Sequence, residues 1–187
     1  VREGSDADYL HGQLVLSGQI GALGLRSTTG LAHQELEERY DATMPDAEDR
    51  VFIQRNETRM FAHETRVWLP LEERRFGWLA GISLIDNRTQ LNRSLERENE
   101  RSATTGVLNT ITEATLYGEG SYRLRAGLIA TLGARFTHAR LGGSAEDVPL
   151  ALLVERAATT ASRDQSAILP SASLLASLGP KTSLYAR

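Results

Sequence analysis

The chain has 187 residues, of which 24% are charged, and a formal net charge of -3 without any cysteine. This length fits about one domain, the charge gives no indication of a nucleic-acid partner, and the lack of cysteine excludes disulfides and thiolate metal sites. No apolar run approaches the roughly 18 to 20 residues of a transmembrane helix, and the mean hydropathy is -0.30.

Alternation of apolar and polar residues is the main pattern along the chain, and it begins near the N-terminus. Leu10, Leu14 and Leu16 lie between polar residues such as His11 and Gln13. Successive side chains of a strand point to opposite faces, so such a stretch predicts one apolar and one polar face. Eight segments in chain order are predicted as strands: 9–17, 22–33, 57–69, 76–86, 109–123, 127–139, 167–178 and 182–187.

The alternation is clearest over residues 112–124. The even positions include Ala114, Leu116 and Leu124, whereas the odd positions carry Glu113 and Arg123. A helix of this sequence would scatter these charges around its axis, and a strand collects them on one face. The pattern fits a wall with lipid on one side and a wet lumen on the other.

The predicted connections alternate between short and long. The short ones are 18–21, 70–75, 124–126 and 179–181, where Gly or Pro supplies turn backbone. The long ones are 34–56, 87–108 and 140–166. Tight turns at one end and long loops at the other are typical of outer-membrane barrels. The sequence therefore predicts an all-β fold, an antiparallel up-and-down transmembrane β-barrel.

Three parts of the long loops have a composition that favours helix. They are residues 34–40, 91–101 and 150–158, and the last includes an apolar stripe of Leu150, Leu153, Val154 and Ala157. One interpretation is a solvated extracellular loop with a fleeting helical turn. The other is a loop helix that folds over the barrel mouth and contacts a ligand.

Charged residues on the polar faces are the candidate lumen residues. They are Glu64, Arg66, Glu113, Glu119, Arg123 and Arg135. Opposite charges on neighbouring strands could pair structurally and contact a plug, or some could guide an anionic ligand. Aromatic residues near strand ends or on apolar faces can sit at the membrane interface; these are Trp68, Trp78, Tyr122 and Phe136.

Catalytic and cofactor chemistry has no positive signal. The histidines at 11, 33, 63 and 138 lie far apart without metal-ligand spacing. No phosphate-binding loop, nucleophile elbow or zinc motif is present. Serine without a positioned general base is not a nucleophile, so the serines are interpreted as ordinary polar residues. We therefore expect no enzyme activity, no catalytic residue, no bound cofactor and no metal site.

Three hairpin segments resemble TonB-dependent outer-membrane receptors. The first is ATLYGEGSYRLRAGLIATLGARFTHAR, with a YGE, a Tyr and Arg before the turn, and Leu, Thr, Gly and Arg after it. The second is HETRVWLPLEERRFGWLAGISLID, and the third is LPSASLLASLGPKTSLYAR. The resemblance covers most of residues 6–187 and describes the barrel wall. The plug domain, the energy-coupling box and the terminal aromatic residue of the family are not among these segments.

The resemblance implies uptake of a scarce ligand, such as a ferric siderophore, at the bacterial outer membrane. The ligand would be cargo, and a TonB-type energy-coupling protein would act through the plug. Barrels of this kind have about 22 strands, so eight strands would form an arc, roughly the middle third. We expect residues 1–187 to be a partial barrel domain and, since the chain begins at Val1, a piece of a longer precursor.

Two other hypotheses stay open at this stage. A complete eight-stranded membrane barrel could serve as an adhesin, a structural protein or a lipid-modifying enzyme, although the last segment is short for the roughly 9 to 11 residues of a spanning strand. A soluble all-β binding module would pack its apolar faces together instead of presenting them to lipid.

Overall fold

The computed structural model describes residues 3–45, 48–98, 100–146 and 160–187. The described chain is built from eight strands: β1 (Gly4–Ile20), β2 (Leu23–Asp41), β3 (Arg50–Leu69), β4 (Phe76–Arg97), β5 (Glu100–Arg125), β6 (Leu128–Glu146), β7 (Ala161–Gly179) and β8 (Thr182–Ala186). Among these residues, no helix is long and apolar enough to cross a membrane.

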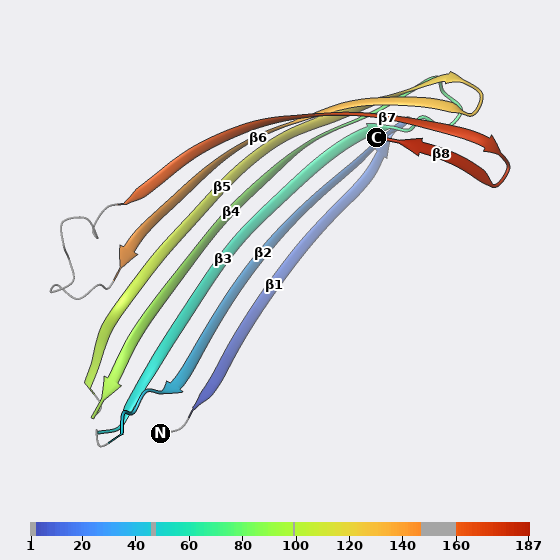
Figure 1. Cartoon of the computed structure of the whole chain (residues 1–187). Helices are drawn as coiled ribbons and strands as arrows, with labels where there is room; N and C mark the ends of the chain where they lie inside the picture. The colour runs from blue at the N-terminus through green and yellow to red at the C-terminus, as the bar shows by residue number, and fades with distance from the viewer. Residues whose placement is uncertain (1–2, 46–47, 99, 147–159) are drawn as a thin grey trace.

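The strands form one sheet in which each strand pairs with the next along the chain. The order is β1 to β8 without a crossover, and every pairing is antiparallel (Figure 1). This is the up-and-down meander that the alternating pattern predicts, so the predicted fold class is confirmed. Within the described residues β1 pairs only with β2 and β8 only with β7, so the sheet does not close on itself.

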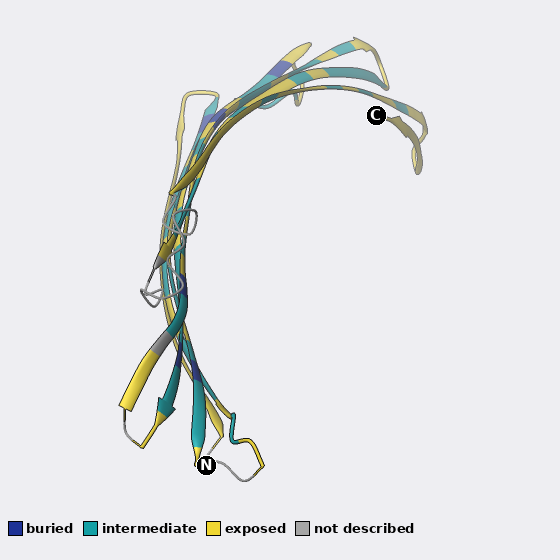
Figure 2. Cartoon of the chain, turned by 60° about the vertical axis from the view of Figure 1, so that its left-hand side comes forward, coloured by how far each residue is buried: buried dark blue, intermediate teal, exposed yellow. Residues whose placement is uncertain are grey.

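The sheet is bent into an arc with one concave and one convex face (Figure 2). One hydrogen-bonded row passes from Gln19 through Gly24 and Trp68 to Glu119 and Ser171. Gln19 lies beside the turn at Gly21, whereas Ser171 lies well before the end of β7. The turns are thus staggered along the strands, as expected when the strands of a barrel wall tilt from its axis.

The two faces of the sheet differ in polarity as the alternation predicts. Ile82, Leu116, Phe136 and Ile168 follow one another in register from β4 to β7, and all are exposed, Leu116 by 61% and Ile168 by 70%. Ile53 is the only buried large apolar side chain among the described residues. Apolar side chains therefore do not pack into a dry core in the described part, which is the packing that a soluble β module would need.

Tight turns join the strands at the end where short connections are predicted. Gly21 has a φ of 61° and Gly127 a φ of 74°. Residues with a side chain rarely adopt this left-handed region, so glycine at these positions lets the chain reverse at little cost. Ser177 N also donates to Gly127 O at 2.6 Å, which joins the turn after β5 to β7.

The opposite end differs from the prediction because the strands are much longer than expected. Most of the predicted loop 34–56 belongs to β2 and β3, which stay paired as far as Asp41 and Val51. The predicted loop 87–108 is wrong: β4 continues to Arg97, and β5 begins at Glu100 opposite it. The long connection expected there is a tight turn at Glu98, whose φ is 48°. The strict alternation of short and long connections therefore does not hold.

The helical segments expected in these loops are also wrong where the structure describes them. Residues 34–40 are strand, and the described part of 91–101 is strand apart from the turn at Glu98. The segment 150–158 lies outside the described residues. The physical reason is that charge pairs join the strands here, such as Arg39 of β2 with Glu96 of β4 at 3.5 Å, across the intervening β3. Where both faces of the sheet meet water, both can carry polar residues. The alternation of apolar and polar residues, by which a strand is predicted, is then absent.

The turn that follows β2 contains a carboxylate with a shifted pKa. Thr43 N donates to Asp41 Oδ1 at 2.9 Å. Hydrogen bonds from the Thr43 side chain and backbone hold the pKa of Asp41 below its ordinary value. The ionised carboxylate of Asp41 therefore stabilises the folded state fully at a pH above the ordinary pKa of aspartate. This stabilisation is lost as the pH falls through the lowered pKa of Asp41.

The substitution Thr43→Ala should raise the pKa of Asp41 toward its ordinary value, because it removes the side-chain hydrogen bond, the largest cause of the shift. Titration of the side-chain carboxyl carbons by NMR measures this. Thr43→Ser keeps the hydroxyl and should leave the pKa of Asp41 low. Equal values in the two variants would contradict this account of the turn.

Candidate functional site

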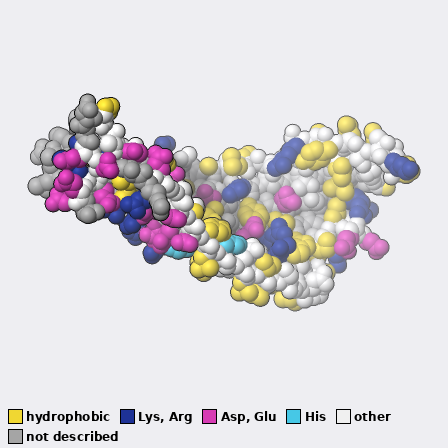
Figure 3. Space-filling model, turned by 90° about the horizontal axis from the view of Figure 1, so that it is seen from below, with side chains coloured by type: hydrophobic (Ala, Val, Ile, Leu, Met, Phe, Trp, Pro, Cys, Tyr) yellow, Lys and Arg dark blue, Asp and Glu magenta, His cyan; other side chains and the backbone are white. Residues whose placement is uncertain are grey.

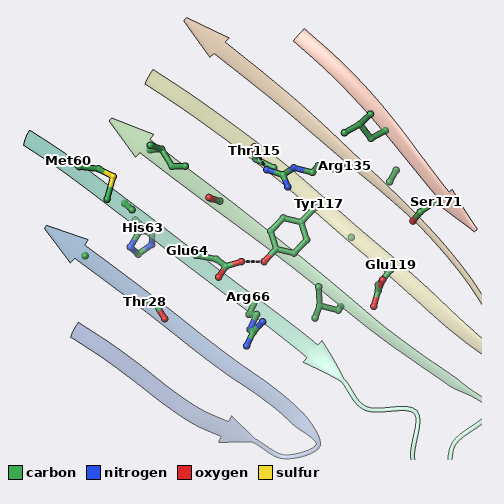
Figure 4. Close-up of a pocket in the computed structure, with 18 of the residues that line it drawn as sticks. Thr28, Met60, His63, Glu64, Arg66, Thr115, Tyr117, Glu119, Arg135 and Ser171 are labelled. Carbon is green, nitrogen blue, oxygen red and sulfur yellow. Dashed lines mark hydrogen bonds between the residues drawn. The ribbon is translucent and has the colours of Figure 1, made fainter. Parts of the chain in front are cut away.

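The concave face holds a cavity of about 920 Å³ that is lined from β1 through β7. Its wall includes charged or hydroxyl-bearing residues from β3, β5, β6 and β7, several of which are labelled in Figure 4. A cavity that touches seven neighbouring strands of a bent sheet lies on its inner side. The polar faces of the strands therefore surround the space that the arc partly encloses.

A hydrogen bond between Tyr117 and Glu64 crosses the middle of this wall. Tyr117 on β5 donates through its hydroxyl to Glu64 Oε1 on β3, and the two side chains point toward one another (Figure 4). Gly81 belongs to β4, the strand between β3 and β5. It lies directly opposite Tyr117 of β5 and directly opposite Arg66 of β3. A Cβ on Gly81 would lie 2.4 Å from Tyr117 Cζ. The missing side chain thus lets the tyrosine ring cross β4 and reach the carboxylate.

A second polar cluster joins β5 to β6. Thr115 is only 2% exposed; its Oγ1 donates to Glu113 Oε1 at 3.0 Å and lies 3.0 Å from Thr137 Oγ1. Arg135 Nη2 lies 3.5 Å from both Glu113 Oε1 and Thr115 Oγ1. The hydroxyl of Thr115 therefore joins an acid, a base and a second hydroxyl in one network.

Three further contacts fix the end of the concave face nearest the tight turns. The Arg66 guanidinium lies 5.8 Å from the centroid of the Trp68 ring, which is within cation–π range. Trp68 in turn covers Gly24, where a Cβ would come within 2.3 Å of the ring. Arg123 donates to the backbone carbonyl of Glu72 in the turn between β3 and β4. These contacts hold the arginines against the sheet.

All six candidate lumen residues lie on one face of the sheet. Glu64, Arg66, Glu119 and Arg135 line the cavity, and Glu113 bonds to its wall. The lining holds Glu64 and Glu119 as well as basic residues, so its charge is mixed. Mixed charge with cross-strand pairing fits the structural interpretation of these residues better than a uniform anion-guiding field.

Replacing Thr115 by valine should lower the free energy of unfolding by about 1 to 3 kcal/mol, because Glu113 and Thr137 would lose a buried partner. The measurement is urea unfolding of the full-length protein in detergent. Thr112→Val is the matched control, since Thr112 donates to Asp86 Oδ2 at 2.8 Å at an exposed position. Water can replace that bond, so the change should stay within about 0.5 kcal/mol. Equal losses in both variants would contradict the role of Thr115.

Sequence reasoning places Tyr117 and Thr115 on the polar face but does not single them out as candidate residues. Both lie on the polar face of the alternation, but neither carries a charge that singles it out. The available signal is Gly81, since a glycine inside a strand often marks a close approach of another group. Gly81 marks the position of a close approach, but the sequence does not indicate which residue of another strand makes it.

His63 and His138 each contact a hydroxyl group of the neighbouring strand. His63 Nδ1 lies 2.8 Å from Thr29 Oγ1, and His138 Nδ1 lies 2.9 Å from Ser166 Oγ. His33, however, lies with Glu35 and Glu57 in a group whose possible ligand atoms are all within 4.8 Å of one another. The expectation of no metal-ligand grouping missed this cluster because one member comes from the neighbouring strand.

The predicted interface aromatics divide between the two faces. Phe76 and Tyr122 are paired in register near the tight turns and are 49% and 45% exposed. Trp78 lies opposite Gly120 on the same convex face, as does Phe136 opposite Leu116. Trp68 differs, since its ring lies over Gly24 and beside Arg66 on the concave face.

Comparison with solved structures shows what this sheet is similar to. It matches the ferric citrate transporter FecA with a TM-score of 0.72 at 10% identity, over 98% of this chain and 27% of that one. The siderophore receptor PiuA from Acinetobacter baumannii gives 0.70 at 10% identity, over 98% and 32%. The ferric yersiniabactin uptake receptor FyuA from Yersinia pestis gives 0.65 at 15% identity, over 97% and 27%.

The chain has the fold of a receptor-barrel segment. It spans about a third or less of the length of these receptors. The resemblance that the three hairpin segments indicate is thereby confirmed at the level of the fold. No protein-family model matches the sequence, and comparison with curated proteins gives no match. FecA, PiuA and FyuA are named as a transporter, a receptor and an uptake receptor respectively.

Proposed function

We propose that this chain forms part of the wall of an outer-membrane receptor barrel that takes up a scarce extracellular ligand. The observation that carries the proposal is the pairing of an exposed apolar convex face with a polar concave face in a sheet of receptor-barrel fold. In water such an apolar face would be costly, whereas in a bilayer it faces lipid. The partners are therefore outer-membrane lipid outside and a wet lumen inside.

The open edges of the sheet support a larger barrel. β1 and β8 each have one strand neighbour within the described residues. Unpaired backbone groups in hydrocarbon cost several kcal/mol each, so open sheet edges do not occur there. We infer that further strands of the same barrel pair with these edges. A self-contained eight-stranded barrel would instead need β1 and β8 to pair with one another.

A ferric siderophore is the proposed class of cargo, and a TonB-type protein is the proposed source of energy. FecA, PiuA and FyuA are named for ferric citrate, siderophore and ferric yersiniabactin respectively. In this proposal the six lumen residues hold the wall together and contact a plug contributed by the rest of the receptor. Neither catalysis nor a resident cofactor forms part of it.

Deletion of the full-length gene tests the proposal. The expected result is slower growth under iron limitation and reduced uptake of radiolabelled ferric siderophore, with both restored by the wild-type gene. Deleting the TonB-type protein should reduce uptake to the same level. Unchanged growth and uptake in the gene deletion would overturn an iron role, and uptake that persists without the coupling protein would overturn the energised mechanism.

A further inference from the structure

We propose that His33, Glu35 and Glu57 form a binding site for a divalent transition-metal ion on the convex face. His33 and Glu35 come from β2 and Glu57 from β3. One possible ligand atom of each residue lies within 4.8 Å of those of the other two. An imidazole with two carboxylates is a donor set suited to ions such as Zn²⁺. The site is separate from the concave cavity and does not depend on the proposed function.

The strand register explains why a cation would be favoured here. Asp8 lies directly opposite Glu35, and Glu35 lies directly opposite Glu57, so three carboxylates form one row across β1, β2 and β3. Like charges directly opposite one another destabilise a sheet. Within the described part of the chain, Asp8 has no ion-pair partner to offset this. A bound dication would offset the repulsion along the row.

The existing contacts leave donor atoms available. Arg59 places Nε and Nη2 at 2.6 Å from the same oxygen of Glu57, Oε1. The second oxygen of Glu57 is not used by this pair. His33 Nε2 lies 3.0 Å from Glu35 Oε1, so the imidazole and the carboxylate are already adjacent. Three protein ligands leave at least one coordination position open to water.

The site also lies where an ion can reach it. His33 and Glu35 have side-chain exposures of 37% and 62%. His33 lies directly opposite the convex residue Leu10, and Glu35 and Glu57 lie in the next row of the convex face, toward the end of the sheet where charged side chains gather (Figure 3). In a membrane-inserted barrel it would lie in water at the outer surface of the bilayer.

Titration with Zn²⁺ tests the proposal on the untagged, full-length protein in detergent and chelator-treated buffer. Isothermal calorimetry should detect one site, and His33→Asn and Glu57→Gln should each weaken binding at least tenfold. Two matched controls should change affinity less than twofold. These are Glu37→Gln, one row farther along β2 and paired with Arg55, and His11→Asn at the concave cavity.

A second measurement needs no variant. The X-ray absorption spectrum of the Zn²⁺-loaded wild-type protein should contain one imidazole nitrogen among oxygen ligands. An all-oxygen shell would overturn the proposal, as would the lack of saturable binding or equal affinity in wild type, His33→Asn and Glu57→Gln. A circular dichroism spectrum of each variant verifies that the strands are retained.

Discussion

The substitution Ile82→Arg should destabilise the full-length barrel in lipid vesicles by about 2 to 4 kcal/mol, the cost of a lipid-facing arginine near the bilayer midplane. Ile82 is 45% exposed on the convex face, opposite Leu116. It lies in the middle of the apolar band, away from the turns and from the charged ends of the strands. Urea-dependent unfolding in vesicles, followed by tryptophan fluorescence, measures the change.

The adjacent residue provides the matched control. Ser83 lines the concave cavity and lies opposite Glu64. An arginine there would point into a wet space beside a carboxylate, so Ser83→Arg should change the free energy of unfolding by less than about 1 kcal/mol. A larger cost for Ser83→Arg than for Ile82→Arg would reverse the assignment of the two faces. The receptor proposal would then lose its main support.

The second large effect is expected at Gly81. Gly81→Ala would place a methyl group 2.4 Å from Tyr117 Cζ and 2.5 Å from its hydroxyl oxygen. The ring must move, and Glu64 then loses its hydrogen-bond donor. Loss of a charge-assisted hydrogen bond and the accompanying strain should reduce the free energy of unfolding by about 2 to 4 kcal/mol. Urea unfolding in detergent provides the measurement.

A double-mutant cycle separates this clash from a general cost of losing glycine. Tyr117→Ser alone removes the ring and the bond to Glu64. In its background Gly81→Ala should cost less than about 0.5 kcal/mol, because contacting residues couple strongly. Gly12→Ala is the control position, since no heavy atom lies within 4 Å of an added Cβ there. Additive losses at Gly81 and Tyr117 would contradict the packing described for this wall.

Side-chain contacts connect the strands along the concave face, which also borders the space that the arc partly encloses. Thr115, Glu113 and Arg135 connect β5 to β6, while Tyr117 and Glu64 connect β5 to β3 across Gly81. Together these contacts span the four strands from β3 to β6, and they resist the opening of a curved sheet. A wall of this kind can keep its shape while the contents of the barrel change, as the proposed transport function requires.

Alternation by itself determined the strand order, the eight strands and the two faces. Leu116 and Glu119 are separated onto opposite faces by the period of two, which holds wherever lipid lies on one side and water on the other. The same reasoning failed over residues 34–41 and 87–97, which are strand. There both faces meet water, and cross-strand pairs such as Arg39 with Glu96 stabilise the sheet without leaving a pattern.

Only the tertiary structure decided which side chains meet. Tyr117 and Glu64 are far apart in sequence, and the stagger of the strands places them on either side of Gly81. The cluster of His33, Glu35 and Glu57 likewise depends on the register between β2 and β3. A two-residue period fixes the face on which a side chain lies. Which side chains lie next to it on that face depends on the strand register, which is set by the hydrogen bonds of the whole sheet.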